Sequence, residues 1–188
     1  MGQYQAEPKR GFQYKRTTPR VVAQGDAALC WAAALESWLD VTVSEKSAND
    51  GVWEGEDAKR NFFEGSAWKR ERLDVKQILV RWKDSTNADG SLKPEKMPML
   101  ALEIGMIGSA FLPYSLREES LRERLKTNGC LYIIYFSARM NHAIVAYGFD
   151  TSDGLFVMDP DMELITRKLD FFKEPIRLQK MMFVGWSV

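Results

Sequence analysis

A thiol, an imidazole and a carboxylate occur in an order along the chain that suits nucleophilic catalysis. Cys30 lies six residues after Gln24, the lone histidine is His142, and Asp159 follows that histidine by seventeen residues. A thiolate attacks a carbonyl carbon, an imidazole transfers protons, and a carboxylate orients the imidazole. Because the 188-residue chain has one histidine and two cysteines, the roles can be assigned in few ways. The pattern predicts a cysteine hydrolase.

The residues around Cys30 predict that this thiol lies at the start of a helix. Asp26 suits the N-cap, and residues 27–39 are mostly strong helix formers without Gly or Pro. The unpaired backbone N–H groups and the dipole of a first helical turn stabilise a thiolate. The predicted buried face carries large apolar residues at helical spacing: Trp31, Leu35, Trp38 and Leu39.

Gln24 is a candidate donor to the oxyanion that forms when a thiolate attacks a carbonyl. Its side-chain amide can fold back from the stretch before the helix and point at the negative oxygen. The backbone N–H of Cys30 would be the second donor. The alternative for Gln24 is an exposed loop glutamine without a catalytic role.

These motifs resemble those of papain-like cysteine peptidases, over roughly residues 20–40 and 115–188. Gln24 and Gly25, then four residues and Cys30-Trp31, match the pattern around the nucleophile of that family. Residues 141–149 are similar to its histidine strand, in which alternating apolar residues and a Gly follow the base. The resemblance implies a Cys30–His142–Asp159 triad and an oxyanion hole at Gln24 and Cys30. It also implies a substrate cleft that includes Trp31 and Asn141, with Trp31 shielding the site.

The chain departs from the plant and lysosomal members of this family. It lacks their disulfide cysteine before the nucleophile, carries Asp159-Pro160 in place of the usual Asn motif, and is short. These features are more similar to bacterial branches, namely double-glycine leader peptidases and injected effector peptidases. The resemblance therefore implies an endopeptidase that forms a thioester intermediate, with cleavage after Gly-Gly as one hypothesis. A delivered toxin or effector with a cognate inhibitor is the corresponding biological hypothesis.

The change of hydrophobic period along the chain predicts an α+β fold, with helices first and an antiparallel sheet last. We expect one domain over residues 1–188, with an extended arm at 1–22, a helical part at 23–115, and a helix plus sheet at 116–188. Residues 44–66 are expected to form a loop with a short helix. Further helices are predicted at 73–83, 94–105 and 116–126, and strands at 130–136, 142–149, 155–158, 164–169 and 182–186.

Composition narrows the classes of partner. The 26 basic and 26 acidic side chains cancel, so we expect no nucleic acid and no anionic membrane as partner. The sequence contains no candidate signal peptide or membrane-spanning segment, which suits a cytoplasmic protein or one delivered by a signal-less secretion system. A single histidine makes a zinc site a poor hypothesis, and no cofactor is expected. Cys130 is expected to pack in a buried strand.

Several structural and functional alternatives remain open. Cys30 and His142 could each be ordinary core residues, although their combination with the other motifs favours catalysis. Asp159 before a proline could be a turn former, with Asp161 as its nearest rival for the triad. The rivals of a peptidase are a deamidase or transglutaminase-like acyl transferase, a peptidoglycan peptide amidase, and a pseudo-peptidase that only binds a partner.

Residues 41–114 should build the cleft wall, with aromatic residues that either grip a peptide or complete the core: Trp53, Phe62, Phe63 and Trp68.

Overall fold

A computed structural model describes residues 13–49, 72–111, 117–137, 141–150, 152, 154–168 and 179–187. The helices are α1 (Cys30–Asn49), α3 (Val75–Arg81), α4 (Met97–Glu103) and α5 (Glu118–Asn128), with short 3₁₀ turns at Ala27–Leu29, Lys83–Ser85 and Pro94–Lys96. The strands are β1 (Gln13–Lys15), β2 (Met106–Phe111), β3 (Leu131–Ser137), β4 (Asn141–Asp150), β5 (Gly154–Asp159), β6 (Glu163–Arg167) and β7 (Gln179–Ser187).

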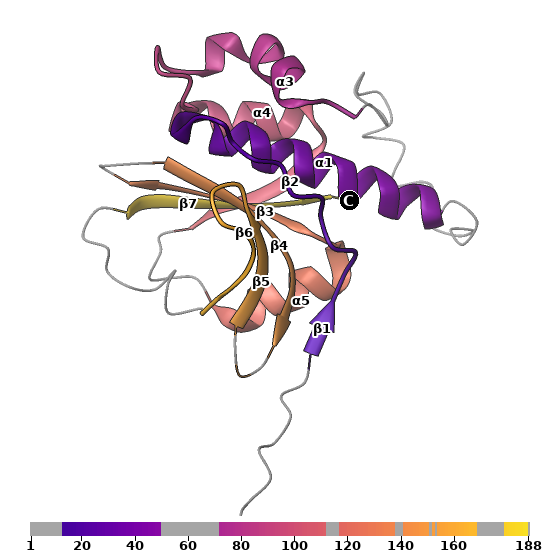
Figure 1. Ribbon diagram of the computed structural model, residues 1–188. Helices are drawn as coiled ribbons and strands as arrows, with labels where there is room; N and C mark the ends of the chain where they lie inside the picture. Colours follow the sequence, from indigo (N-terminus) through magenta and orange to yellow (C-terminus); the bar gives the residue numbers. More distant parts are fainter. Residues whose placement is uncertain are drawn as a thin grey trace, which may run out of the picture.

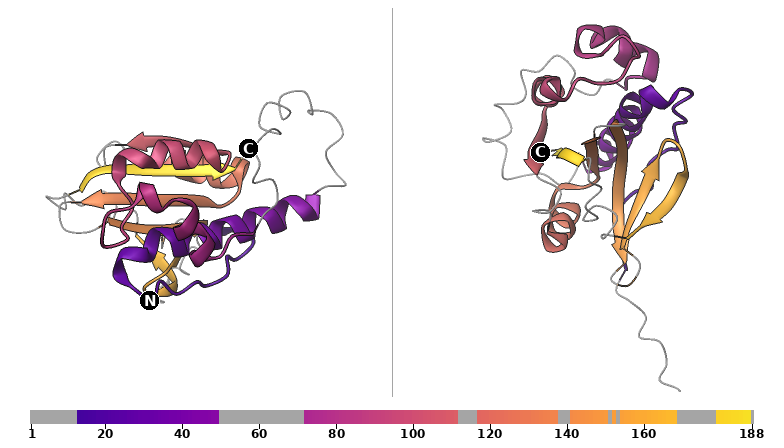
Figure 2. Two further views of the ribbon diagram at one scale, coloured as in Figure 1. Left: turned by 90° about the horizontal axis from the view of Figure 1, so that it is seen from above. Right: turned by 90° about the vertical axis from the view of Figure 1, so that its left-hand side faces the viewer.

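The strands form one seven-stranded sheet in the order β2-β7-β3-β4-β5-β6, and β1 pairs with the far end of β4. All the pairs are antiparallel. Helices α1, α3 and α4 lie on one face of the sheet and α5 lies on the other (Figure 1; Figure 2). The predicted α+β fold, with an N-terminal helix (α1) packed on an antiparallel sheet, is confirmed.

Alternating side chains of β3 and β4 divide the core into two layers. Tyr132 and Ile134 of β3 pack with the apolar face of α1, whereas Leu131 and Ile133 pack with α5. The period of two along each strand places successive side chains on opposite faces. The predicted buried face of α1 is confirmed, since all four of its large apolar residues are at most 1% exposed: Trp31, Leu35, Trp38 and Leu39.

Two secondary-structure predictions were wrong. Helix α1 continues to Asn49, so the predicted loop does not begin at Ser44. The sequence contains no Gly or Pro between Cys30 and Asn49, and nothing local therefore ends the helix earlier. Strand β2 lies inside the part expected to be helical, and its register with β7 makes it an edge strand of the sheet. The four aromatic residues predicted at the cleft wall lie outside the described residues.

The described part of the predicted arm, residues 13–22, is bound to the domain. β1 pairs with the end of β4, where a Cβ on Gly148 would lie 2.5 Å from the backbone oxygen of Tyr14. A glycine is therefore required for this close approach of two strands. Arg16 donates through Nε to the Leu125 carbonyl of α5 at 3.0 Å. Because helix C-termini leave carbonyls unpaired, Arg16 satisfies part of the end of α5.

Candidate active site

Cys30 is the first residue of α1, as the sequence predicted, although a 3₁₀ turn precedes the helix. Asp26 is the N-cap of that turn, and its carboxylate accepts from the Ala28 N–H at 3.0 Å. Cys30 is 1% exposed, and its Sγ donates to the backbone oxygen of Asn141 at 3.4 Å. The thiol therefore lies between the start of the helix and the start of β4.

His142 is the second residue of β4 and has two acidic neighbours, Asp159 and Cys30. Its Nε2 lies 2.8 Å from Oδ1 of Asp159. The Cys30 thiol lies close enough to the ring to favour the charged imidazole and to help raise its pKa. The antiparallel register places Tyr135 of β3 opposite His142, with the two rings edge to face at 5.5 Å. The imidazole is thus oriented by a carboxylate on one side and faces the thiol on the other.

Asp159 ends β5 and is 1% exposed. Its Oδ1 accepts from His142 and also from the backbone N–H of Asp161 at 3.0 Å, and its Oδ2 accepts from Nη2 of Arg167 at 3.0 Å. A buried carboxylate is tolerated where cations and N–H donors surround it in this way. Between the two rival carboxylates of the sequence, the structure brings Asp159 to the imidazole.

Two opposite charges face each other at neutral pH in this site. Burial tends to lower the pKa of His142, but hydrogen bonds to Asp159 and to Cys30 outweigh it and raise the pKa to about 9. Burial tends to raise the pKa of Asp159, but the hydrogen bonds from His142, Arg167 and the Asp161 N–H bring it down to about 2. The arrangement therefore favours an imidazolium between a carboxylate and an ionisable thiol.

Gln24 lies against the turn that follows Asp159. Its backbone N–H donates to the oxygen of Pro160 at 3.4 Å, and its Nε2 donates to Oδ1 of Asp161 at 3.4 Å. Among the described residues, its buried Oε1 has no hydrogen-bond partner. The structure therefore brings Gln24 to the loop that carries Asp159, while its predicted donation to an oxyanion stays a prediction.

The two residues predicted in the substrate cleft both hold the segment at residues 90–92. Trp31 donates from Nε1 to the Gly90 oxygen at 2.9 Å, and Asn141 donates from Nδ2 to the Leu92 oxygen at 3.3 Å. Trp31 is 1% exposed, so the structure places it in the core and not on an exposed wall, whereas Asn141 is half-buried. Both residues fix a neighbouring segment beside the start of α1.

Two residues of this site, Tyr135 and Arg167, were not predicted from the sequence. Tyr135 meets His142 only through the register between β3 and β4, which no local pattern reveals. The sequence held only a weak indication of Arg167. Pro160 suggests a turn after Asp159, and in the antiparallel strand that follows such a turn, every second residue lies on the same face of the sheet as Asp159. Among the described residues, no group of three or more potential ligands is arranged to hold a metal ion.

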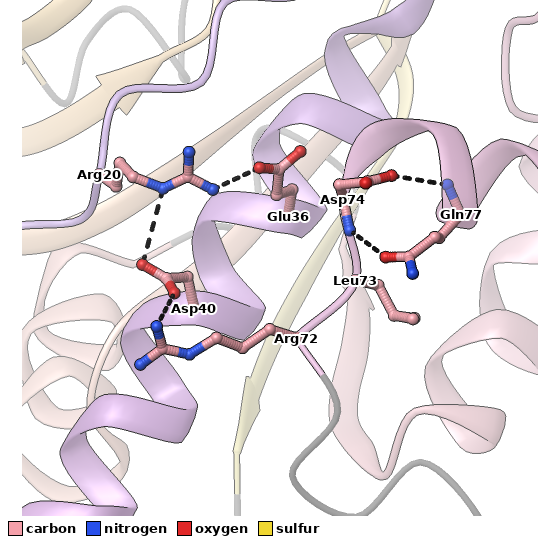
Figure 3. A pocket seen from close by; sticks show the side chains of 7 residues that line it. All are labelled: Arg20, Glu36, Asp40, Arg72, Leu73, Asp74 and Gln77. Carbon is pink, nitrogen blue, oxygen red and sulfur yellow. Dashed lines mark hydrogen bonds and ion pairs between the residues drawn. The ribbon is translucent and has the colours of Figure 1, made fainter.

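A separate pocket of ≈ 310 Å³ lies where the arm, α1 and the start of α3 meet (Figure 3). Its charged side chains pair with each other: Arg20 contacts Glu36 and Asp40, and Arg72 contacts Asp40 at 3.3 Å. Glu36 also accepts from the Val75 N–H at 2.7 Å. These pairs join three segments of the chain, and none of the candidate catalytic residues lines the pocket.

Comparison with solved structures supports the same fold. A double glycine motif protease from an AMS/PCAT transporter, solved in complex with its leader peptide, has a TM-score of 0.52 and 16% identity over 96% of this chain and 100% of that chain. The peptidase domain of Streptococcus ComA, a bifunctional ABC transporter involved in quorum sensing, has a TM-score of 0.53 and 14% identity over 91% of this chain and 100% of that chain. No curated protein matches by sequence.

The comparison with protein families is more specific. The family model described as papain-like cysteine protease AvrRpt2 matches residues 65–177, which is more than half of the chain and includes His142 and Asp159. The described residues contain no helix that is long and apolar enough to cross a membrane. The chain belongs to the AvrRpt2 family of papain-like cysteine proteases.

Proposed function

We propose that this protease is an endopeptidase in which Cys30 is the nucleophile, His142 the general acid and base, and Asp159 the residue that orients the imidazole. One observation carries the proposal: Nε2 of His142 lies 2.8 Å from Asp159, and the neighbouring Cys30 thiol helps to raise the pKa of the same ring. The position of Cys30 at the start of α1 adds the helix dipole to the stabilisation of a thiolate.

The proposed reaction starts from the pair in which the Cys30 proton already resides on His142, so that a thiolate faces an imidazolium. The thiolate attacks the carbonyl carbon of the scissile bond, and the imidazolium then gives its proton to the departing amine. Water, deprotonated by His142, attacks the thioester and releases the second product. Asp159 remains ionised throughout and keeps the imidazole in the tautomer and orientation that each transfer needs.

Gln24 and the backbone N–H of Cys30 form the proposed oxyanion hole. The amide of Gln24 has two N–H donors, and one of them is directed to Asp161. The second is available for the oxyanion of the tetrahedral intermediate, in a position set by the two contacts of Gln24 with the turn at Pro160 and Asp161.

The proposed substrate is a protein that is cleaved after Gly-Gly. The fold is shared with a double glycine motif protease, and the segment at residues 90–92 is held close to the start of α1 by Trp31 and Asn141. A close wall beside the nucleophile favours residues without side chains. We further propose that the protease acts as a delivered effector or toxin and that a cognate inhibitor protects the producing cell.

A terminal-labelling experiment tests the endopeptidase assignment. The protein, its Cys30→Ala variant and its Cys130→Ala variant are incubated with a bacterial lysate under reducing conditions, and new N-termini are identified by mass spectrometry. Cys130→Ala is the matched control, because Cys130 is the second buried cysteine, with its Sγ 3.7 Å from the Thr17 oxygen. We expect new termini with the intact protein and with Cys130→Ala, and none with Cys30→Ala.

The positions of the new termini, together with separate assays of ammonia release, sacculus cleavage and bacterial growth, distinguish the rival hypotheses. New termini that follow Gly-Gly pairs would support the proposed specificity, and termini after other residues would contradict it. Ammonia release without cleavage would point to deamidation or acyl transfer, and cleavage of purified sacculi alone would point to a peptidoglycan amidase. Slower bacterial growth with the intact chain than with Cys30→Ala would support the toxin hypothesis, whereas equal growth would count against it.

A further inference from the structure

The carboxylate of Asp159 contacts two cationic side chains, one from each of the strands that flank β5. His142 of β4 faces Oδ1 at 2.8 Å, and Arg167 of β6 faces Oδ2 at 3.0 Å. Asp159 is 1% exposed, whereas the side chain of Arg167 is 22% exposed. Little water reaches the carboxylate, and the guanidinium is therefore its main charged neighbour besides the imidazole.

We infer that Arg167 is a positioning residue of the active site, which fixes Asp159 with Oδ1 toward His142 and offsets part of the negative charge that the imidazole meets. This inference rests on the proposed roles of His142 and Asp159. A guanidinium is suited to the task because its planar group binds a carboxylate oxygen in a defined direction and stays charged at every working pH. Arg167 also contacts Sδ of Met162 through Nη2 at 3.0 Å, which restricts the side chain further.

The charge balance explains why such a residue is needed. A buried, unshared carboxylate would bind the imidazolium so strongly that His142 would give up its proton slowly. Proton release is required when the imidazolium protonates the leaving amine, and the free base is required when water attacks the thioester. The second cation lets an aspartate orient the imidazole without holding the proton too firmly.

The charged and titratable groups that surround the imidazole come from several elements. Cys30 of α1 and Asp159 of β5 favour the charged imidazole, and Arg167 of β6 opposes it through Asp159. Tyr135 of β3 stays neutral in the working range, since burial, followed by the Asp159 charge, raises its pKa. The remaining charged neighbour in the turn is Asp161, whose N–H donates to Asp159 and whose carboxylate accepts from Gln24.

The single histidine of the chain allows a direct test. The imidazole signals in an NMR spectrum all belong to His142, and their titration gives its pKa in the intact protein and in Arg167→Met. We expect the pKa of His142 to rise by about one pH unit in Arg167→Met, because removal of the guanidinium leaves the carboxylate charge unshared. Arg167→Lys, which keeps the charge, should stay close to the wild type.

Two matched variants complete the design. Arg124→Met removes the same charge from α5, where the guanidinium lies 3.8 Å from the Trp186 ring centroid, and should leave the titration of His142 unchanged. Arg167→Gln keeps a donor for Oδ2 without the charge, and it tests the inference if the methionine variant does not fold. An unchanged or lower pKa of His142 in folded Arg167→Met or Arg167→Gln would overturn the inference.

The outcomes for the inference and for the proposed function can be separated. The titration reads the charge at His142 whether or not a substrate is cleaved. Loss of the proposed function would appear as an absence of Cys30-dependent cleavage by the wild type. If the wild type cleaves, we expect kcat of Arg167→Met at neutral pH to fall about tenfold, with a smaller loss in Arg167→Lys. Equal losses in both variants would show that shape and not charge matters at this position, and would contradict the inference.

Discussion

At the level of single residues, the candidate site differs from one that uses a neutral asparagine to orient the histidine. An amide would accept a hydrogen bond from His142 without changing the charge of the site. Asp159 adds a full negative charge, and its hydrogen bonds from His142 and Arg167 keep its pKa near 2. The charge should therefore be visible in the titration of the imidazole.

Asp159→Asn is expected to lower the pKa of His142 from about 9, because burial remains while the strongest group favouring the imidazolium is lost. The alkaline limit of kcat/KM should move to lower pH, and kcat/KM at neutral pH should fall by about 10²-fold. NMR titration of the one histidine and a pH–rate profile measure the two effects. Asp161→Asn serves as the control, and its His142 should titrate as in the wild type. A pKa of His142 that stays near 9 in Asp159→Asn would count against the triad.

Gln24→Ala is expected to lower kcat by about 10² to 10³-fold, as loss of one oxyanion donor does in other hydrolases. Alkylation of Cys30 by iodoacetamide creates no oxyanion, so its rate should be unchanged in this variant. Asp161→Asn should reduce kcat less, since it weakens only the anchor of the Gln24 amide. A parallel loss of alkylation in Gln24→Ala would show that Gln24 acts on the thiol or on the fold, and the oxyanion role would have to be abandoned.

At the level of elements, a charged cluster holds helix α1 to the arm and to the start of α3. Glu36 of α1 is 8% exposed, pairs with Arg20 and accepts from the Val75 N–H at 2.7 Å. Asp40, one turn later, pairs with Arg20 and Arg72 but has a side chain 22% exposed. The two carboxylates belong to one cluster and differ mainly in burial (Figure 3).

This difference predicts unequal losses of stability. Glu36→Ala should lower the free energy of unfolding by about 2 kcal/mol, because it leaves the half-buried Val75 N–H without this acceptor. Asp40→Ala should cost about 0.5 kcal/mol, since ion pairs with exposed arginines contribute little. Urea titrations of the two variants under the same conditions give the comparison. Equal losses, or a larger loss in Asp40→Ala, would contradict the assignment of Glu36 as the residue that joins α1 to α3.

At the level of the whole molecule, the His142–Asp159 pair ties stability to pH. The pKa of His142 is raised from 6.5 to about 9, so its contribution is complete below about pH 6.5 and disappears as the pH rises through 9. The pKa of Asp159 is lowered from 3.8 to about 2, so its contribution is complete above about pH 4 and disappears as the pH falls through 2. The pair therefore stabilises the fold most between these limits.

We expect the free energy of unfolding of the protein to fall by about 1–3 kcal/mol between pH 6 and pH 10, as the stabilisation from this pair is lost. Denaturant unfolding of the intact protein under reducing conditions measures the change across the alkaline range. In the matched variant His142→Gln this pH dependence should largely vanish. An alkaline loss of the same size in both proteins would assign it to other groups.

Local features of the fold could be predicted because short-range interactions produce them. The start of α1 follows from the Asp26 cap and from the helix-forming residues after it. The buried face of the same helix follows from apolar residues at helical spacing, and the strands from alternating apolar residues. The edge strand β2 escaped prediction because its hydrogen bonds go only to β7, more than seventy residues later in the chain.

The candidate chemistry was readable in the chain, whereas its surroundings required the tertiary structure. One thiol, one imidazole and few carboxylates at suitable spacing are properties of residue types, and they predicted Cys30, His142 and Asp159 without coordinates. Which carboxylate meets the imidazole, and that Arg167 shares it, depends on the register of three strands. Register is a non-local property, because a shift of one residue moves every side chain to the other face of the sheet.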